Sequence, residues 1–153
     1  MIEARLKELN IDLPAPMAPA ANYVPFVKMG SIVLVSGQLP FFKGELKYKG
    51  KVGGDLTLEM GQEAARLCAL HILAQVKEAC EGDLNRVRRC LRLGGFVNSS
   101  EIFLDHPKVI NGASDLMISV FGDKGQHVRL AVGAAALPLG AAVEIEALFE
   151  VSY

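Results

Sequence analysis

The chain has 153 residues, 51% of them hydrophobic, and its sixteen basic and seventeen acidic residues leave a formal charge of -1. That length predicts one domain over residues 1–153 with a sizeable core, and the apolar content argues against disorder. The near-zero charge gives no general attraction to nucleic acid or to acidic membranes, so neither is an expected partner.

No stretch of the sequence predicts export or membrane insertion. Residues 1–12 are charged and lack the apolar centre of a secretory signal, and the apolar run 130–143 is too short and too interrupted to span a bilayer. The three cysteines show no CxxC spacing, and the three histidines form no metal-binding motif with them. We therefore expect a cytoplasmic protein with reduced thiols and no metal site.

The N-terminal third predicts a helix, an arm and two strands. Residues 1–21 hold a short amphipathic helix followed by an extended arm rich in proline. Strands are expected at residues 23–28 and 31–36, around a turn at Met29-Gly30. The second strand ends in Ser36-Gly37, which offers a ligand a hydroxyl group and close approach to the backbone; alternatively, Gly37 only turns the chain.

A loop and the longest helix follow. Residues 41–54 contain four glycines and four lysines but no phosphate-binding motif, so a solvated surface loop is expected. Residues 57–80 repeat apolar side chains at helical spacing, and Gly82 follows as a helix terminator. Within this helix, His71 is expected to be a helix-surface or contact residue rather than a catalytic group.

The next segments predict a third strand, at residues 86–98, and a second helix, at residues 107–121. A bulge or a close contact is expected in the strand at Gly94-Gly95, and its four arginines are expected to pair with nearby acids. In the helix, the sequence Asn111-Gly112-Ala113-Ser114 disfavours helical structure, and such a penalty is expected where a side chain serves a ligand. Asn111 is therefore a candidate ligand contact, with capping or local backbone bonding as the alternative.

The last segment contains a single arginine, Arg129, beside a long apolar run. Alternation with a period of two predicts two strands, joined into a hairpin at residues 137–140. Leu130 and its alternates would face the core, whereas Arg129 and Ala131 would lie on the opposite face. A guanidinium beside so much apolar sequence needs a partner, which is either a planar carboxylate ligand or a glutamate of the neighbouring strand.

The element order β-β-α-β-α-β-β predicts an α+β fold whose sheet has two helices on one face. The opposite face would hold Arg129 and small residues, and no element of the chain remains to cover it. We therefore expect a cyclic homo-oligomer in which other subunits cover this face.

These motifs together resemble the Rid/YjgF family of reactive-intermediate (enamine/imine) deaminases over nearly the whole chain. The resemblance implies a chorismate-mutase-like fold with a mixed sheet, assembled as a homotrimeric barrel with three ligand clefts between subunits. The matching stretches are Tyr23 followed thirteen residues later by Ser36-Gly37-Gln38-Leu39-Pro40, then Ile110-Asn111-Gly112, and Arg129 with Leu137-Pro138 and Val143-Glu144-Ile145-Glu146-Ala147.

The resemblance also implies roles for individual residues. Arg129 looks like the family's arginine that holds the substrate carboxylate, and Glu144 looks like the acid near the reacting carbon and water. A 2-aminoacrylate-like enamine would be protonated at carbon, attacked by water and released as ammonia and a 2-keto acid, without a metal or organic cofactor. The residues that look like the lining of the cleft are Tyr23, Ser36, Gly37 and Asn111.

Two departures from the family's best-studied branch bear on substrate choice. Ala131 stands where that branch has a cysteine, and His127-Val128 stands where it has Pro-Ala. With the N-terminal arm and the 41–54 loop, they indicate a divergent branch. Two other functions stay open. One is binding of a small carboxylate without turnover. The other is an endoribonuclease or translation-inhibitor activity, which the charge of -1 disfavours.

The predicted hairpin also has a geometric consequence. If its turn is tight, Arg129 and Glu144 lie roughly 13–20 Å apart along it. That is too far for one small substrate to touch both in a single chain. We therefore expect Arg129 to meet Glu144 of a neighbouring subunit, or the turn not to be tight.

Overall fold

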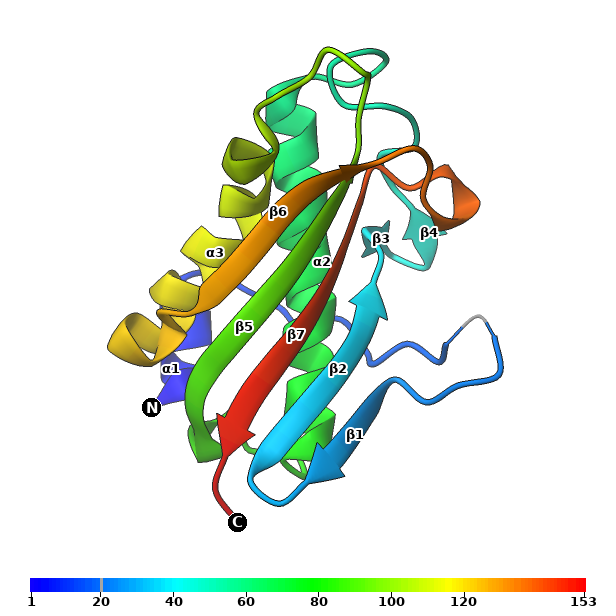
Figure 1. Cartoon of the computed structure of the whole chain (residues 1–153). Coiled ribbons are helices and arrows are strands. Elements are labelled where there is room, and N and C mark those ends of the chain that lie inside the picture. Colours follow the sequence, from blue (N-terminus) through cyan, green and yellow to red (C-terminus); the bar gives the residue numbers. More distant parts are fainter. Residues whose placement is uncertain (20) are drawn as a thin grey trace.

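The computed structural model describes residues 1–19 and 21–153. Its main sheet has five strands in the order β1-β2-β7-β5-β6, and two long helices cover one face of it (Figure 1). The strands are β1 (Phe26–Met29), β2 (Ile32–Gln38), β5 (Val87–Asn98), β6 (Val128–Ala134) and β7 (Val143–Val151). The helices are α1 (Ile2–Glu8), α2 (Leu58–Ala79) and α3 (His106–Phe121), and the shorter elements are β3 (Phe41–Phe42), β4 (Glu45–Leu46), η1 (Leu84–Arg86), η2 (Gly122–Gly125) and η3 (Pro138–Gly140).

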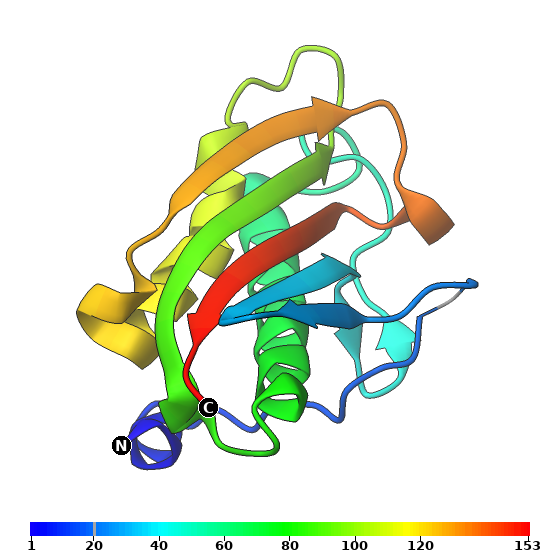
Figure 2. The same cartoon turned by 60° about the horizontal axis from the view of Figure 1, so that its bottom comes forward.

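The sheet is mixed, as the family resemblance implied. β5 and β6 run parallel, and the other neighbouring strands are antiparallel. With the molecule tilted as in Figure 2, the twisted sheet lies in front and α2 and α3 lie behind it, which confirms that both long helices cover the same face. β3 and β4 add a small hairpin within the predicted 41–54 loop.

Helix α2 has the ends that its sequence predicted to within one residue. The Thr57 hydroxyl accepts a hydrogen bond from the Met60 backbone N–H and so caps the first turn. At the other end Gly82 takes a φ of 91°, which a residue with a side chain rarely adopts. Between these ends, one side of the helix is almost completely buried, and this burial stabilises it more than its intrinsic propensity does.

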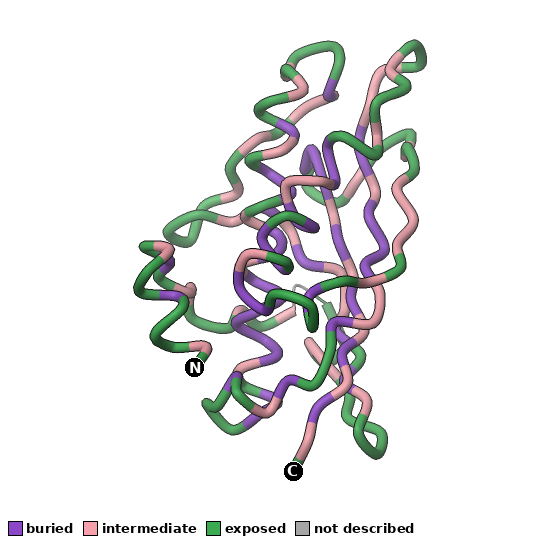
Figure 3. The backbone as a smooth tube through the Cα atoms, turned by 90° about the vertical axis from the view of Figure 1, so that its left-hand side faces the viewer, coloured by how far each residue is buried: buried purple, intermediate pink, exposed green. Residues whose placement is uncertain are grey.

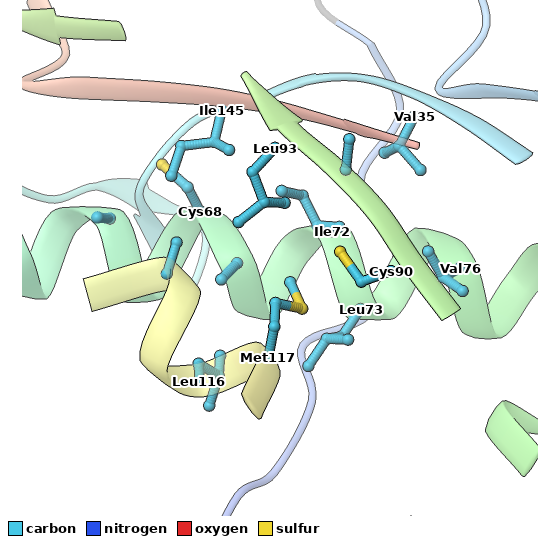
Figure 4. Packing of buried hydrophobic residues seen from close by; sticks show 14 of the residues in the cluster. Val35, Cys68, Ile72, Leu73, Val76, Cys90, Leu93, Leu116, Met117 and Ile145 are labelled. Atoms are coloured by element: carbon cyan, nitrogen blue, oxygen red, sulfur yellow. The ribbon is translucent and has the colours of Figure 1, made fainter. Parts of the chain in front are cut away.

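The core lies between the helices and the sheet. Figure 3 shows the buried residues concentrated along the inner helices and strands, with the exposed residues in the loops. Ile72 of α2 packs with Leu93 of β5 and Ile145 of β7, and Met117 closes the layer from α3 (Figure 4). All three cysteines are free and buried in this region, as expected. No helix in the described part of the chain combines the length and the apolar character that crossing a membrane requires.

The predicted hairpin between the last two strands is wrong. β6 and β7 do not pair with each other, because β5 lies between them and pairs with both. A period-two pattern identifies a strand but not its neighbour, so two consecutive strands were assigned to each other by proximity in sequence. The loop through η3 instead carries the chain across the end of β5 (Figure 1).

The predicted orientation of β6 is also wrong. Arg129 pairs in register with Leu93, whose side chain is completely buried on the helix side, so Arg129 lies on the helix side as well. Val132 and its alternates face the other way, and Val132 is 40% exposed. The side of β6 with more apolar character was assigned to the core, but β6 is an edge strand. The face without helices therefore exposes apolar side chains, namely Val27, Leu34, Val128 and Val132.

The two glycines of β5 serve close contacts rather than a bulge. Register is continuous from Leu93 to Val97, and the irregularities lie earlier, near Arg88 and Leu91. A side chain on Gly95 would overlap Ile110 of α3, and one on Gly94 would overlap Glu146 of β7. Of the two options that the sequence left open, the close contact is confirmed.

The weak helix formers at residues 111–114 of α3 also have a packing role. Gly112 faces the backbone of Gln62 in α2, and a Cβ atom on Gly112 would overlap the Gln62 carbonyl oxygen. The absence of a side chain therefore sets how closely the two helices approach. This contact, rather than a ligand, accounts for one of the weak helix formers in the segment.

We predict that Gly112→Ala destabilises the protein by about 1–3 kcal/mol, although alanine favours helix, because α2 and α3 are forced apart. Urea unfolding measures the change. Gly54→Ala is the matched control, since its Cβ would meet Lys51 at 3.6 Å or more and its φ is not in the left-handed region. Equal stability of Gly112→Ala and the native protein would contradict the close-contact role.

Candidate functional site

A pocket of about 200 Å³ opens where β2 ends, and the structure places four of the six predicted site residues around it. These four are Tyr23, Ser36, Gly37 and Glu144. The other two, Arg129 and Asn111, do not line it. The groups singled out from the sequence therefore fall into two separate clusters.

The backbone at the end of β2 shapes this pocket. Pairing with β7 slips between Val35 and Gln38, which bends the strand away from its neighbour. The Ser36 N–H and hydroxyl both donate to the Pro25 carbonyl oxygen, at 2.9 and 3.0 Å, and so tie the bend to the segment before β1. A side chain on Gly37 would overlap the Glu144 carboxylate, so glycine is required for Glu144 to reach its position.

Glu144 is the acid of this pocket. Burial, followed by the nearby charge of Glu146, raises the pKa of Glu144 above its ordinary value. Glu146 itself pairs with Arg92 across the sheet, at 3.1 Å, whereas Glu144 has no cationic partner among the described residues. A carboxyl group with a raised pKa keeps its proton closer to neutral pH, which is what a general acid needs.

The remaining walls are mostly apolar. Leu39, Phe41, Pro138 and Leu139 line the pocket together with the arm, to which Met17 belongs. The arm is held in place because the Gln75 amide donates to the Met17 carbonyl oxygen at 2.9 Å. Part of the pocket wall is thus the N-terminal segment that the sequence predicted as an extended surface arm.

His71 contributes to the same pocket from α2. It is only 4% exposed, so it is a contact residue and not a helix-surface one. Its Nε2 lies 2.9 Å from the Phe41 carbonyl oxygen, and because a carbonyl only accepts, Nε2–H is the donor. Burial lowers the pKa of His71, which favours the neutral ring. No sequence motif marked this residue.

Arg129 belongs to the edge strand β6, and its side chain contacts α3. Its guanidinium donates from Nη1 to the Ser114 hydroxyl at 3.1 Å and from Nη2 to the Pro107 carbonyl oxygen at 2.9 Å. These bonds use two of the five N–H donors that a guanidinium has. Asn111 lies between Pro107 and Ser114 on the same face of α3, by helical spacing. The alternative that Arg129 pairs with a glutamate of the sheet is wrong for the described residues.

The two clusters are far apart within one chain. Arg129 is in register with Leu93 and Glu144 with Phe96, three residues further along β5. Two strand spacings of about 4.8 Å and three residues of about 3.3 Å put the two Cα atoms roughly 14 Å apart. In addition, the register with β5 places Arg129 on the helix side of the sheet and Glu144 on the opposite side. We call the clusters the arginine half-site (Asn111, Ser114, His127, Arg129) and the acid half-site (Tyr23, Ser36, Gly37, Glu144).

The sequence signalled one part of the arginine half-site without identifying it. The weak helix formers at 111–114 indicated a side chain with another task, and the prediction chose Asn111. In the structure Ser114 has that kind of contact, since its hydroxyl lies within hydrogen-bond distance of both Arg129 and His127. Only the pairing of β6 with β5 brings these three residues together, so spacing along the chain could not reveal them.

Comparisons with known proteins agree over almost the full chain. The family model described as "YjgF/chorismate_mutase-like, putative endoribonuclease" matches residues 3–151. Protein TCP17 of Trypanosoma cruzi is 50% identical over 152 residues, which cover 99% of this chain and 94% of that one. The crystal structure of Atu1372 from Agrobacterium tumefaciens, a protein of unknown function, is also 50% identical. It superposes with a TM-score of 0.93 over 99% of this chain and 92% of that chain.

A more distant structure is that of RidA from the Antarctic bacterium Psychrobacter sp. PAMC 21119. It is 28% identical and superposes with a TM-score of 0.61, covering 90% of this chain and 94% of its own. On the family model and on these relatives, the chain belongs to the YjgF/Rid family.

Proposed function

We propose that the protein hydrolyses reactive enamine and imine intermediates, such as 2-aminoacrylate, to 2-keto acids and ammonia. The observation that supports this most is the division of the site. A carboxyl group with a raised pKa lines one pocket, and a guanidinium with unused donors lies on another edge. Each half-site holds what the other lacks for binding and protonating a small carboxylate.

A second copy of the chain supplies the missing half. The arginine half-site lies at the β6 edge of the sheet, and the acid half-site lies at the end of β2, so the two surfaces of one subunit differ. A contact between unlike surfaces repeats from subunit to subunit and closes into a ring when the rotation permits. A homotrimer with three clefts is the assembly proposed, and the exposed apolar side chains opposite the helices would be covered in it.

The chemistry follows from the two groups. Arg129 holds the substrate carboxylate through two parallel hydrogen bonds, which fixes the orientation of the enamine. Glu144, or a water molecule that it polarises, gives a proton to the β-carbon, and the carbon–carbon double bond becomes a carbon–nitrogen double bond. Water then adds to the imine carbon, the carbon–nitrogen bond breaks, and ammonia leaves behind the 2-keto acid. Proton transfer and orientation are sufficient for these steps.

Two other candidate functions of the same site are carboxylate binding without turnover and RNA cleavage. Binding of a small carboxylate without turnover is the second candidate, because Ala131, two residues after the arginine on the helix side, has no ionisable group. RNA cleavage has less support. In the arginine-rich stretch, Arg86 pairs with Glu81 at 3.6 Å and Arg92 with Glu146 at 3.1 Å, so part of its charge is neutralised.

We predict that Arg129→Ala and Glu144→Gln each lose at least about 100-fold in imine deamination, because each removes one half of the site. When the two variants are co-expressed, about one quarter of the native activity should return. In a ring of randomly mixed subunits, one cleft in four receives both an intact arginine and an intact acid. The assay is ammonia release from freshly generated 2-iminopropionate.

The double variant Arg129→Ala/Glu144→Gln, co-expressed with native chain, serves as the control for subunit exchange. This mixture should be less active than the native protein, because the double variant supplies neither the arginine nor the acid to any cleft. Mixed single variants that stay inactive, although they assemble together, would contradict a cleft shared between subunits.

We also predict that Glu144→Gln makes the fold more stable at neutral pH. Because the pKa of Glu144 is raised in the folded state, that state binds its proton more tightly than the unfolded chain does. The native protein therefore loses stability as pH rises above the ordinary value of 4.5 and through the raised value, and the amide variant does not. Urea midpoints at about pH 4 and pH 7 measure this difference, which should be small at the lower pH.

Glu150→Gln is the control for that measurement, since Glu150 lies on the same face of β7 and loses the same charge. A gain of equal size and equal pH dependence in this variant would assign the effect to the net charge of the strand and not to burial of Glu144.

A further inference from the structure

A chain of hydrogen bonds reaches Arg129 from the loop before β6. His127 Nδ1 lies 2.6 Å from the Gly125 carbonyl oxygen, and His127 Nε2 lies 2.8 Å from the Ser114 hydroxyl. The same hydroxyl oxygen accepts from Arg129 Nη1 at 3.1 Å. Four groups are thus joined in one line: they come from η2, from the residue just before β6, from α3 and from β6 itself.

The Gly125 carbonyl sets the first hydrogen bond of this series, and the tautomer of His127 sets the second. A backbone carbonyl can only accept, so His127 Nδ1 carries the hydrogen and donates it to Gly125. In the tautomer with its hydrogen on Nδ1, Nε2 is an acceptor and takes the hydrogen of the Ser114 hydroxyl. The Ser114 hydrogen therefore points toward His127, and the lone pairs of its oxygen are left for the arginine. Ser114 and His127 each accept one hydrogen bond and donate the next, whereas Arg129 only donates and the Gly125 carbonyl only accepts.

The hydrogen-bond series ends at Arg129, a side chain with few other conformational restraints. An arginine has four rotatable bonds, and at an edge strand few neighbours restrict it. Here two anchors on one face of α3, the Ser114 hydroxyl and the Pro107 carbonyl oxygen, hold Nη1 and Nη2 separately. Two anchored nitrogens, together with the covalent link through Nε, fix the plane of the guanidinium, and three of its five N–H donors make no hydrogen bond within the described residues.

We infer that Ser114 and His127 are positioning residues, which orient the Arg129 guanidinium before the ligand arrives. The inference rests on the proposed function only for the identity of the ligand, a small carboxylate. Ser114, which is 8% exposed, acts on the ligand through Arg129. His127 acts one step further away, by keeping the Ser114 hydrogen turned from the guanidinium. An arginine oriented in advance loses less conformational freedom on binding, so affinity rises without a new contact to the ligand.

The test compares Ser114→Ala and His127→Phe with the native protein. The first removes the acceptor for Arg129, and the second keeps a planar ring but removes both of its nitrogens. Each should weaken the binding of 2-ketobutyrate, measured by calorimetry, by roughly tenfold. In the deamination assay KM should rise by a similar factor while kcat changes little, because the carboxylate is held alike in the ground state and the transition state.

The chain offers a matched control. Ser99 and His106 form a second serine–histidine contact, at 3.0 Å, and neither residue bonds to Arg129. Ser99→Ala should therefore bind 2-ketobutyrate as the native protein does. Ser114→Thr keeps the hydroxyl group and should recover most of the affinity that Ser114→Ala loses. Two results would overturn the inference. One is an equal loss of affinity in Ser99→Ala and Ser114→Ala. The other is native affinity in Ser114→Ala or in His127→Phe.

A second measurement separates this inference from the proposed function. Nitrogen-15 NMR of the Arg129 guanidinium needs no ligand and reports whether rotation about its Cζ–Nε bond is slow. The native protein should show separate Nη signals, and Ser114→Ala should show averaged ones. Averaged signals in the native protein would overturn the inference, even if the protein deaminates imines. Separate native signals without any carboxylate binding would support the positioning roles and reject the proposed ligand.

Discussion

The pairing of β5 with β6 on one side and β7 on the other decides where the functional groups of this protein lie. β5 is in continuous register with both neighbours from Leu93 to Val97, and Gly94 and Gly95 let β7 and α3 approach it closely. Because β5 lies between β6 and β7, the Cα atoms of Arg129 and Glu144 are roughly 14 Å apart and their side chains lie on opposite sides of the sheet. A single chain therefore presents two incomplete half-sites, and the proposed cleft between copies follows from that separation.

Neither half-site pairs its ionisable group with an opposite charge among the described residues, but the surroundings of the two groups differ. The arginine half-site holds its cation with neutral acceptors, a hydroxyl and a backbone carbonyl, which leave its charge uncompensated. The acid half-site holds Glu144 without a cation, partly buried, and its pKa is raised as a result. Arg92 and Glu146, by contrast, neutralise each other nearby. A cation without an anion and a carboxyl group that tends to keep its proton together suit a substrate that brings one carboxylate and accepts one proton.

Membership in the YjgF/Rid family explains the scaffold, and the local residues distinguish this branch. Ala131 supplies no thiol beside the arginine, whereas His127 and Ser114 connect that arginine to the backbone at η2. The N-terminal arm, fixed by Gln75, forms part of the wall of the acid half-site. Residues of this kind vary independently of the fold that carries them.

The sequence by itself determined the elements of this fold, because each depends on local spacing. The bounds of α2 follow from Thr57, Gly82 and a stripe of apolar residues, and an α+β sheet with two helices on one face follows from the order of elements. It also selected Arg129 and Glu144 by residue type and by family resemblance. The tertiary structure alone decided which strands are neighbours, and with that the side on which Arg129 lies. Period-two alternation is the same for either face of an edge strand and carries no information about pairing. For the same reason the contacts of His71, Ser114 and His127 emerged only from the folded chain, since they join segments whose pairing no local pattern determines.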